Sequence, residues 1–175
     1  LPLELNRIDD DDLEQRSGAA TLARYGPWLR DVRAYRPHQL SDDLERLLHE
    51  KKISGRSAWM RLFDETVAAL RFPVAGKDLT SAEALNLLSD ADEGRRRAAA
   101  KSIGQVFGEN IRTFSLITNT LAKDKETEDK WRQFEHPISE RNLSNHVEDE
   151  VVDALVQAVK QSYPRLSHRY YDLKA

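Results

Sequence analysis

One short run of the sequence contains the first half of a zinc-binding motif. His49 and Glu50 are followed by Lys51, Lys52 and Ile53, whereas the motif His-Glu-x-x-His requires a second histidine at the last position. In that motif the two histidines bind the metal and the glutamate activates a water molecule. Ile53 has no donor atom. The run therefore predicts an exposed helix end, where cationic side chains are favoured, and not a metal site.

Two other sets of side chains have metal-ligand chemistry. His146 and Glu150 are four residues apart, and the residues from Asp9 to Asp12 are four adjacent carboxylates that could attract a hard cation. Two ligands are too few for a zinc site, and acidic residues in the first turn of a helix are favoured by the helix dipole. We therefore assign no catalytic, cofactor-binding or metal-binding residue to this chain. An enzyme that uses an unrecognised site at His49, Glu50, His146 or Glu150 stays an open alternative.

The basic residues of the chain do not indicate nucleic-acid binding. Arg95, Arg96, Arg97 and Lys101 form a cluster with no aromatic residue between them, and they sit near the start of an expected helix. Because positive charge is unfavourable there, we expect these side chains to pair with the nearby acids Asp90, Asp92 and Glu93.

The overall composition excludes further classes of protein. The formal net charge is −3, so no global field favours nucleic acid or a membrane surface as a partner. No stretch approaches the roughly 18 apolar residues that can span a bilayer. The chain has no cysteine, so it has no disulfide framework, which fits a cytoplasmic location. The tripeptide from Asn142 to Ser144 matches a glycosylation sequon, but no secretory signal supports its use.

The middle of the chain is predicted to fold as a helix, a hook and further helices. Pro73 ends the first helix, because proline cannot donate to the helical ladder and forces the preceding residue into an extended conformation. The hook from Phe72 to Leu79 turns at Ala75-Gly76 and predicts a very short hairpin. Thr80 and Glu83 have the spacing of a capping box for the next helix. The first helix carries a periodic stripe: Trp59, Leu62, Phe63, Thr66, Val67 and Leu70.

The later part of the chain is predicted to be helical as well. The run Gly108-Glu109-Asn110 breaks one long helix, and a second follows from Thr113 to about Trp131. Asn145 is expected to cap the next helix and Pro164 to open the last one. The helix after Asn145 has one apolar face that we expect to be buried: Val147, Val151, Val152, Leu155 and Val159. The predicted fold is all-α, a multi-helix array with short loops and one small hairpin near residues 72–79.

Several stretches of the sequence resemble the N-terminal region of oligoendopeptidase F, which belongs to the thimet-oligopeptidase-like zinc metallopeptidases. The resemblance spans nearly the whole chain, although no single landmark is a catalytic motif. Its landmarks are Trp59 with Leu62, Phe63 and Asp64; the hook Phe72 to Leu79; Leu85 to Leu88; the Arg-Ala helix that closes on Phe107; Pro37 to Ser41; Asn119 to Lys125; and His168 to Ala175.

This resemblance implies a fragment of a larger enzyme. The parent would hydrolyse short oligopeptides with one zinc ion, held by two histidines and a distant glutamate, and none of these residues is in this chain. Residues 1–107 would be an N-terminal helical domain, and residues 108–175 the truncated opening helices of the metallopeptidase domain. The missing initial methionine and the end at Lys174-Ala175 without a capping glycine also indicate a piece of a longer chain.

The expected role is structural. The segment would form one wall of the substrate channel, restrict entry to short peptides, and bind the remainder of the catalytic domain without catalysing a reaction itself. By itself it would associate through Thr113–Trp131 or Pro164–Ala175, because uncovered apolar stripes tend to pair. The alternative is a free-standing helical protein-interaction module without catalysis, which would bind a partner helix.

Overall fold

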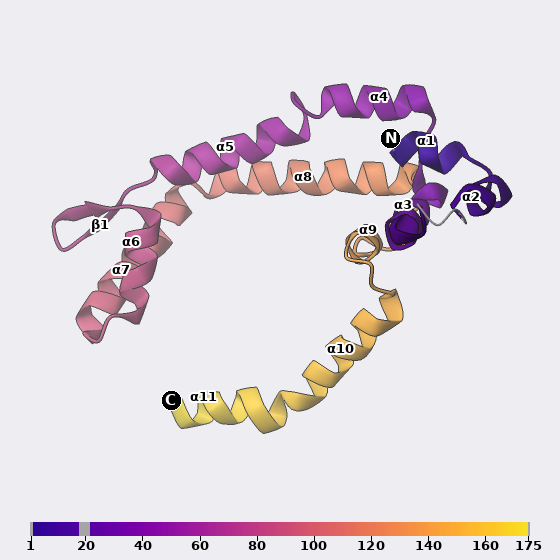
Figure 1. The fold of residues 1–175 in the computed structure, drawn as a ribbon. Coiled ribbons are helices and arrows are strands. Elements are labelled where there is room, and N and C mark those ends of the chain that lie inside the picture. Colours follow the sequence, from indigo (N-terminus) through magenta and orange to yellow (C-terminus); the bar gives the residue numbers. More distant parts are fainter. Residues whose placement is uncertain (1, 18–21, 175) are drawn as a thin grey trace. The chain divides into compact units, whose positions relative to one another are not determined.

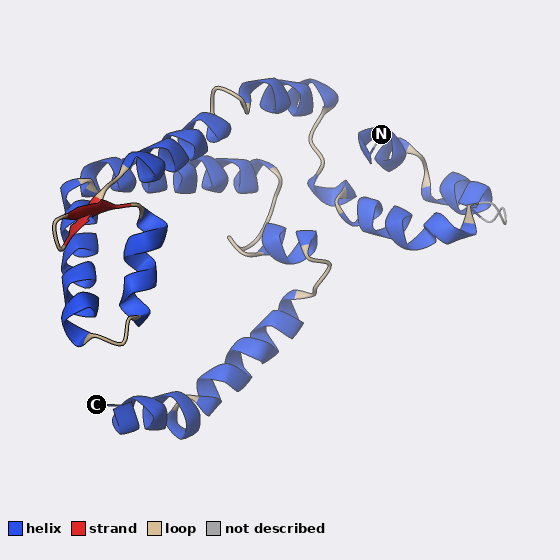
Figure 2. Cartoon of the chain, turned by 60° about the vertical axis from the view of Figure 1, so that its left-hand side comes forward, coloured by secondary structure: helices blue, strands red, loops and turns tan. Residues whose placement is uncertain are grey.

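The computed structural model describes residues 2–17 and 22–174 (Figure 1). The described chain is all-α with a single two-stranded hairpin, which confirms the predicted fold class (Figure 2). It divides into two compact units, Leu1–Asp42 with Glu128–Ala175 and Asp43–Thr127. We describe each unit by itself. The predicted domain boundary at residues 107 and 108 stays a prediction.

The unit of residues 43–127 contains the hairpin and the two longest helices. The middle of the chain follows the predicted order of helix, hook, short helix and long helix. Its elements are α4 (Asp42–Lys51), α5 (Arg56–Ala69), β1 (Phe72–Val74), β2 (Lys77–Leu79), α6 (Ser81–Asn86), a 3₁₀ turn (Leu87–Ser89), α7 (Glu93–Glu109) and α8 (Ile111–Trp131), whose last turn belongs to the other unit.

The hinge after α5 forms as its sequence predicts. Leu70 has an extended backbone with ψ of 143°, and the guanidinium of Arg71 donates to the Ala68 and Leu70 carbonyl oxygens at 2.9 and 2.8 Å. The strands pair antiparallel with Phe72 opposite Leu79, Pro73 opposite Asp78 and Val74 opposite Lys77. Ala75 and Gly76 both have positive φ, 51° and 78°, which suits the two-residue turn of a tight hairpin.

A small core lies between this hairpin, α6 and α7. Phe72 and Ala84 have 1% and 0% of their surface exposed, and Val106 has 9%. Leu70, Leu79, Ile103 and Phe107 pack around these three residues. The capping box is present, because the Thr80 hydroxyl accepts from the Glu83 N–H while the Glu83 carboxylate accepts from the Thr80 N–H at 2.8 Å. The hook is therefore the centre of the unit.

Asn110 separates the two long helices, as the sequence predicted. Its backbone leaves the helical region, with φ of −100° and ψ of 5°, and its side-chain amide donates to the Val106 carbonyl oxygen at 2.9 Å. The bond satisfies a carbonyl at the end of α7 that no later residue of the helix can reach. Phe114 on α8 then lies against Phe107 on α7, with ring centroids 5.7 Å apart.

The second unit joins the beginning of the chain to its end. It is built from short elements that hydrogen bonds and ion pairs connect. These are α1 (Pro2–Arg7), α2 (Asp10–Ser17), a 3₁₀ turn (Ala23–Tyr25), α3 (Gly26–Ala34), a second 3₁₀ turn (Arg36–His38), α9 (Ser139–Ser144), α10 (Asp149–Ser162), a π-helical turn (Pro164–His168) and α11 (Arg169–Lys174).

A reciprocal contact ties the second 3₁₀ turn to the end of α8 in this unit. The Arg132 guanidinium donates to the His38 carbonyl oxygen at 3.2 Å, and His38 Nδ1 lies 2.8 Å from the Arg132 carbonyl oxygen. The ring of His38 also stacks on Phe134, with centroids 3.9 Å apart. Glu128 accepts from Arg132 Nε at 2.8 Å, which holds the arginine in place.

Three expectations for the last third of the chain need correction. Asn145 does not cap a following helix. It ends α9, a helix that the sequence analysis missed, and α10 begins after Glu148. Pro164 opens a π-helical turn before α11. The apolar face of α10 is not buried in the described chain, since Val151 and Leu155 are 53% and 63% exposed.

Candidate functional site

The incomplete zinc motif does not form a site. His49 and Glu50 are exposed in the last turn of α4, which ends at Lys51. Ile53 lies beyond the helix and is 70% exposed. Even the helical spacing that would bring two ligands to one face is therefore lost at this position.

His146 and Glu150 do not share a helix. His146 lies in the turn between α9 and α10 with a φ of 54°, and its Nδ1 is 3.8 Å from an Asp31 carboxylate oxygen on α3. Glu150 is exposed in the first turn of α10. Among residues 2–17 and 22–174, no group of three or more His, Cys, Asp or Glu side chains could hold a metal ion. These residues therefore do not fit the zinc site that the family resemblance implies for the parent.

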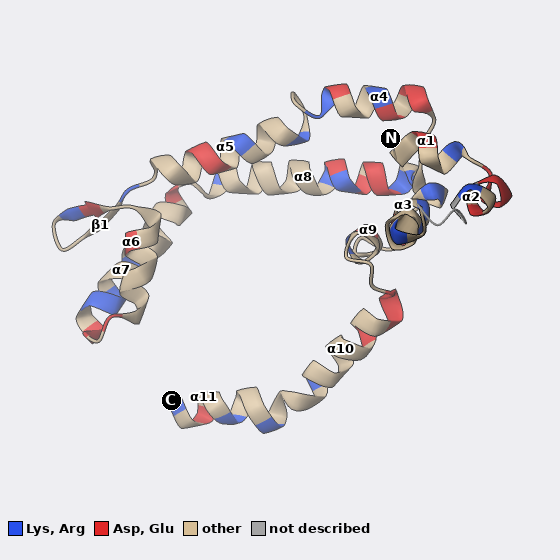
Figure 3. Cartoon of the chain, in the orientation of Figure 1, with Lys and Arg blue, Asp and Glu red and all other residues tan. Residues whose placement is uncertain are grey.

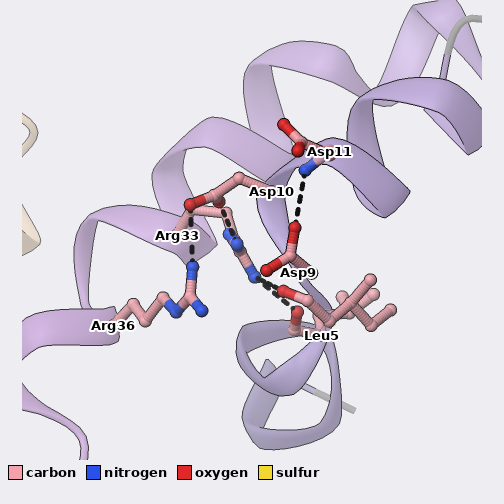
Figure 4. A network of polar contacts seen from close by, with 7 residues as sticks. Leu5, Asp9, Asp10, Asp11, Arg33 and Arg36 are labelled. Atoms are coloured by element: carbon pink, nitrogen blue, oxygen red, sulfur yellow. Dashed lines mark hydrogen bonds and ion pairs between the residues drawn. The ribbon is translucent and has the colours of Figure 1, made fainter.

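The acidic run at Asp9 begins α2 and has a structural role that its spacing did not indicate. Asp9 accepts from the Asp11 N–H at 3.0 Å, while Asp10 pairs with Arg33 and Arg36 (Figure 4). The hydrogen bond from Arg33 holds the pKa of the Asp10 carboxyl below its usual value. Arg33 also donates to the Leu5 carbonyl oxygen at 2.9 Å, so a single guanidinium holds both of the first two helices.

The basic side chains at the start of α7 lie beside acidic ones, as predicted (Figure 3). Arg97 lies 2.6 Å from Glu93, and Arg95 lies 3.5 Å from Asp90. Arg96 donates to the Asp90 carbonyl oxygen at 2.8 Å. The pKa of the Asp90 carboxyl is lowered first by the N–H of Asp92 and then by Arg95 and Arg96. The cluster therefore stabilises the start of α7.

The asparagine of the sequon is held inside the fold. Asn142 is 4% exposed, and its side-chain nitrogen donates to an Asp149 carboxylate oxygen at 2.7 Å. Ser139 Oγ donates to the other oxygen of the same carboxylate at 3.2 Å. A glycan on Asn142 would require this nitrogen and would break the contact. Sequence reasoning missed the contact because a sequon gives no sign of burial.

Many large apolar side chains of the described residues are exposed. Few hydrophobic side chains of the described residues are buried. Exposed examples in one unit are Met60, Leu62, Phe63, Ile111 and Leu116, and in the other Trp28, Leu155, Leu166, Tyr170 and Tyr171. Large exposed apolar patches commonly mark interaction sites. No helix among the described residues is long and apolar enough to cross a membrane.

Two of three comparisons with known proteins found similar proteins, and both point to peptidases. A family model for oligopeptidase F matches residues 4–72. The crystal structure of oligoendopeptidase F from Enterococcus faecium is similar, with a TM-score of 0.84 and 27% identity over 99% of this chain. A crystal structure assigned as a peptidase from Chlamydophila abortus has a TM-score of 0.84 and 16% identity over 99% of this chain, which shows a shared fold. The sequence finds no significant match among curated proteins.

The family model and the first of the similar structures show a likeness to the N-terminal portion of a peptidase. The resemblance to oligoendopeptidase F that the sequence predicted is confirmed. The chain spans 35% of the length of the Enterococcus structure and 30% of the Chlamydophila structure.

Proposed function

We propose that this segment is the N-terminal part of an oligoendopeptidase F-like zinc metalloendopeptidase, and that by itself it is inactive. The parent hydrolyses peptide bonds in short oligopeptides. The observation that carries the proposal is the similarity of 99% of this chain to 35% of an oligoendopeptidase F structure. The exposed apolar side chains of both units support it, because a lobe of a larger enzyme is covered by the rest of that enzyme.

The zinc chemistry belongs to the remainder of the parent. This sequence has no His-Glu-x-x-His motif, and its described residues offer no metal-ligand cluster. We therefore derive no catalytic step from this segment. Its own contribution is to form one wall of the substrate channel and to restrict entry to short peptides, in a cytoplasmic enzyme. The long helices α7 and α8, separated only by Asn110, give such a wall its length.

The isolated segment is also proposed to associate with itself. In the range Thr113–Trp131 of α8, Leu116 and Trp131 are 58% and 49% exposed. The end of the chain exposes Leu166, Tyr170, Tyr171 and Leu173. Sedimentation at high micromolar concentration tests this proposal, and a strictly monomeric species contradicts it.

The native chain decides the proposed function. An antibody against this segment identifies the intact protein in its cell, and its mass, zinc content and cleavage of a short quenched peptide are measured. A mass several times the 20.1 kDa of the segment, with bound zinc and cleavage, supports the proposal. A native mass close to that of the segment contradicts it and favours the interaction module. Zinc-dependent cleavage by the purified segment contradicts its proposed inactivity.

A further inference from the structure

We infer that the outer face of α10 is the docking surface for an amphipathic helix from the rest of the parent chain. The inference rests on the proposed function and names the partner surface within this segment. We call five side chains on one face of this helix the α10 stripe. They are Val151 (53% exposed), Leu155 (63%), Val156 (41%), Val159 (42%) and Tyr163 (43%).

The α10 stripe is largely exposed among the described residues, although Tyr163 at its end stacks on His168. The main contacts of α10 are with α9, which precedes it, and with the π-helical turn, which follows it (Figure 1). The opposite face carries Glu150, Gln157 and Gln161, so the helix is strongly amphipathic. In water an isolated helix of 14 residues is marginal, and most helices in proteins depend on packing of their apolar face. The sequence of α10 is therefore typical of a helix that is stabilised by packing its apolar face against another element.

A well-defined corner fixes the point from which α10 begins. The buried Asn142 and the Ser139 hydroxyl both donate to the Asp149 carboxylate in the first turn of α10. The Val147 N–H donates to the Asn142 carbonyl oxygen at 3.1 Å, and His146 turns the chain with its positive φ. These contacts join the two helices directly, so α10 starts from a corner of specific hydrogen bonds.

The corner is also anchored to the rest of its unit. His146 lies 3.8 Å from Asp31 on α3, and Glu140 and Ser144 of α9 both influence the pKa of Tyr35 at the end of α3. Burial raises the pKa of the Tyr35 hydroxyl, which agrees with its place against α9. These contacts place the α9–α10 corner beside α3. The unit holds the uncovered stripe in a defined position.

A helix of the same polypeptide is the occupant that these features favour. This chain matches 35% of the Enterococcus peptidase along 99% of its own length, so most of that relative lies outside the match. A stripe one helical face wide accepts one further helix by ridges-into-grooves packing. Acids at the beginning of α10 and Lys160 near its end would favour opposite charges at the matching ends of the partner.

Hydrogen exchange of α10 tests the inference in the full-length parent and in the isolated segment. We expect the backbone amides of residues 153–162 to exchange at least about tenfold more slowly in the parent, because docking suppresses local opening. In the parent, Leu155→Glu should remove this protection by placing a charge in the interface. The matched control Gln157→Glu, on the opposite face, should leave it unchanged. Equal exchange in parent and segment overturns the inference.

Two further readouts separate the inference from its alternatives. Peptide cleavage by the parent is measured independently, so protection of α10 in a parent that cleaves no peptide supports the docking surface and contradicts the proposed function. Exchange in the isolated segment is repeated across a range of concentrations together with sedimentation. Protection that appears only with a dimer and disappears with Leu155→Glu assigns the stripe to a second copy and overturns the inference.

Discussion

The ring of Phe107 meets the ring of Phe72 edge to face, with centroids 5.6 Å apart. Phe107 makes a second edge-to-face contact with Phe114, which in turn contacts Phe63 at 5.7 Å. A row of aromatic rings thus connects β1, α7, α8 and α5. The hairpin is too short to be stable alone, and this row gives it a packed neighbour.

Phe72→Ala should destabilise the unit that contains the hairpin by about 3–5 kcal/mol, because it empties the most buried large side chain of the core. Leu85→Ala is the matched control. Leu85 lies on the neighbouring helix α6 and is 52% exposed, so its truncation should cost far less. Urea unfolding followed by circular dichroism measures both. Similar losses for the two variants would contradict a core centred on the hook.

Thr80→Ala should move the pKa of Glu83 part of the way toward its ordinary value of 4.5, because alanine removes the Thr80 hydroxyl that lowers it and keeps the Thr80 N–H, which is the larger cause. A lowered pKa means that this carboxylate adds stability above its unfolded pKa and that the contribution disappears as the pH falls through the folded pKa. Titration of Glu83 by NMR checks the direction. Glu83→Gln keeps an acceptor for the cap, so its unfolding should depend less on pH below about 4.5 than that of the unchanged chain. An unshifted Glu83 in the unchanged chain would contradict the prediction.

The features that sequence reasoning predicted are local ones. The hook depends on Pro73 and the Ala75-Gly76 turn, and the cap depends on residues three positions apart. Such signals lie within one stretch of chain, so they can be read without the fold. The break at Asn110 belongs to the same kind.

The features that sequence reasoning missed depend on distant residues. His38 and Arg132 hold each other across 94 positions, and neither has a neighbour in sequence that indicates the contact. The corner between α9 and α10 was not predicted. Asn145 has the residue type of a helix cap, whereas nothing in the sequence indicates the contact between Asn142 and Asp149. The apolar face of α10 was predicted to be buried. Periodicity shows that a helix has an apolar face, but it does not show which element packs on that face.

Arg33→Ala should release the first two helices from α3. Arg33 donates to the Leu5 and Ile8 carbonyl oxygens and pairs with Asp10, and its side chain is only 12% exposed. Hydrogen bonds from a charged donor contribute roughly 1.5–3 kcal/mol, so amide exchange in α1 and α2 should accelerate by at least about tenfold. Arg36→Ala is the control, because Arg36 contacts Asp10 from a side chain that is 39% exposed. Equal acceleration in both variants would show that the charge of Asp10, and not the carbonyl contacts, holds the helices.

Ser102→Ala should stabilise the unit that contains the hairpin. Ser102 lies on the buried face of α7 between Ala99 and Val106, is 7% exposed, and its hydroxyl oxygen has no hydrogen-bond partner in the described structure. A buried polar group without a partner costs about 1–3 kcal/mol. Alanine also has a higher helix propensity than serine, by about 0.5 kcal/mol. The matched control Ser115→Ala changes an exposed serine of α8, so it should yield only the helix-propensity gain. Urea unfolding of the two variants measures the difference, which we expect to be about 1 kcal/mol in favour of Ser102→Ala. A loss of stability in Ser102→Ala would mean that the hydroxyl makes a favourable contact, such as with a buried water.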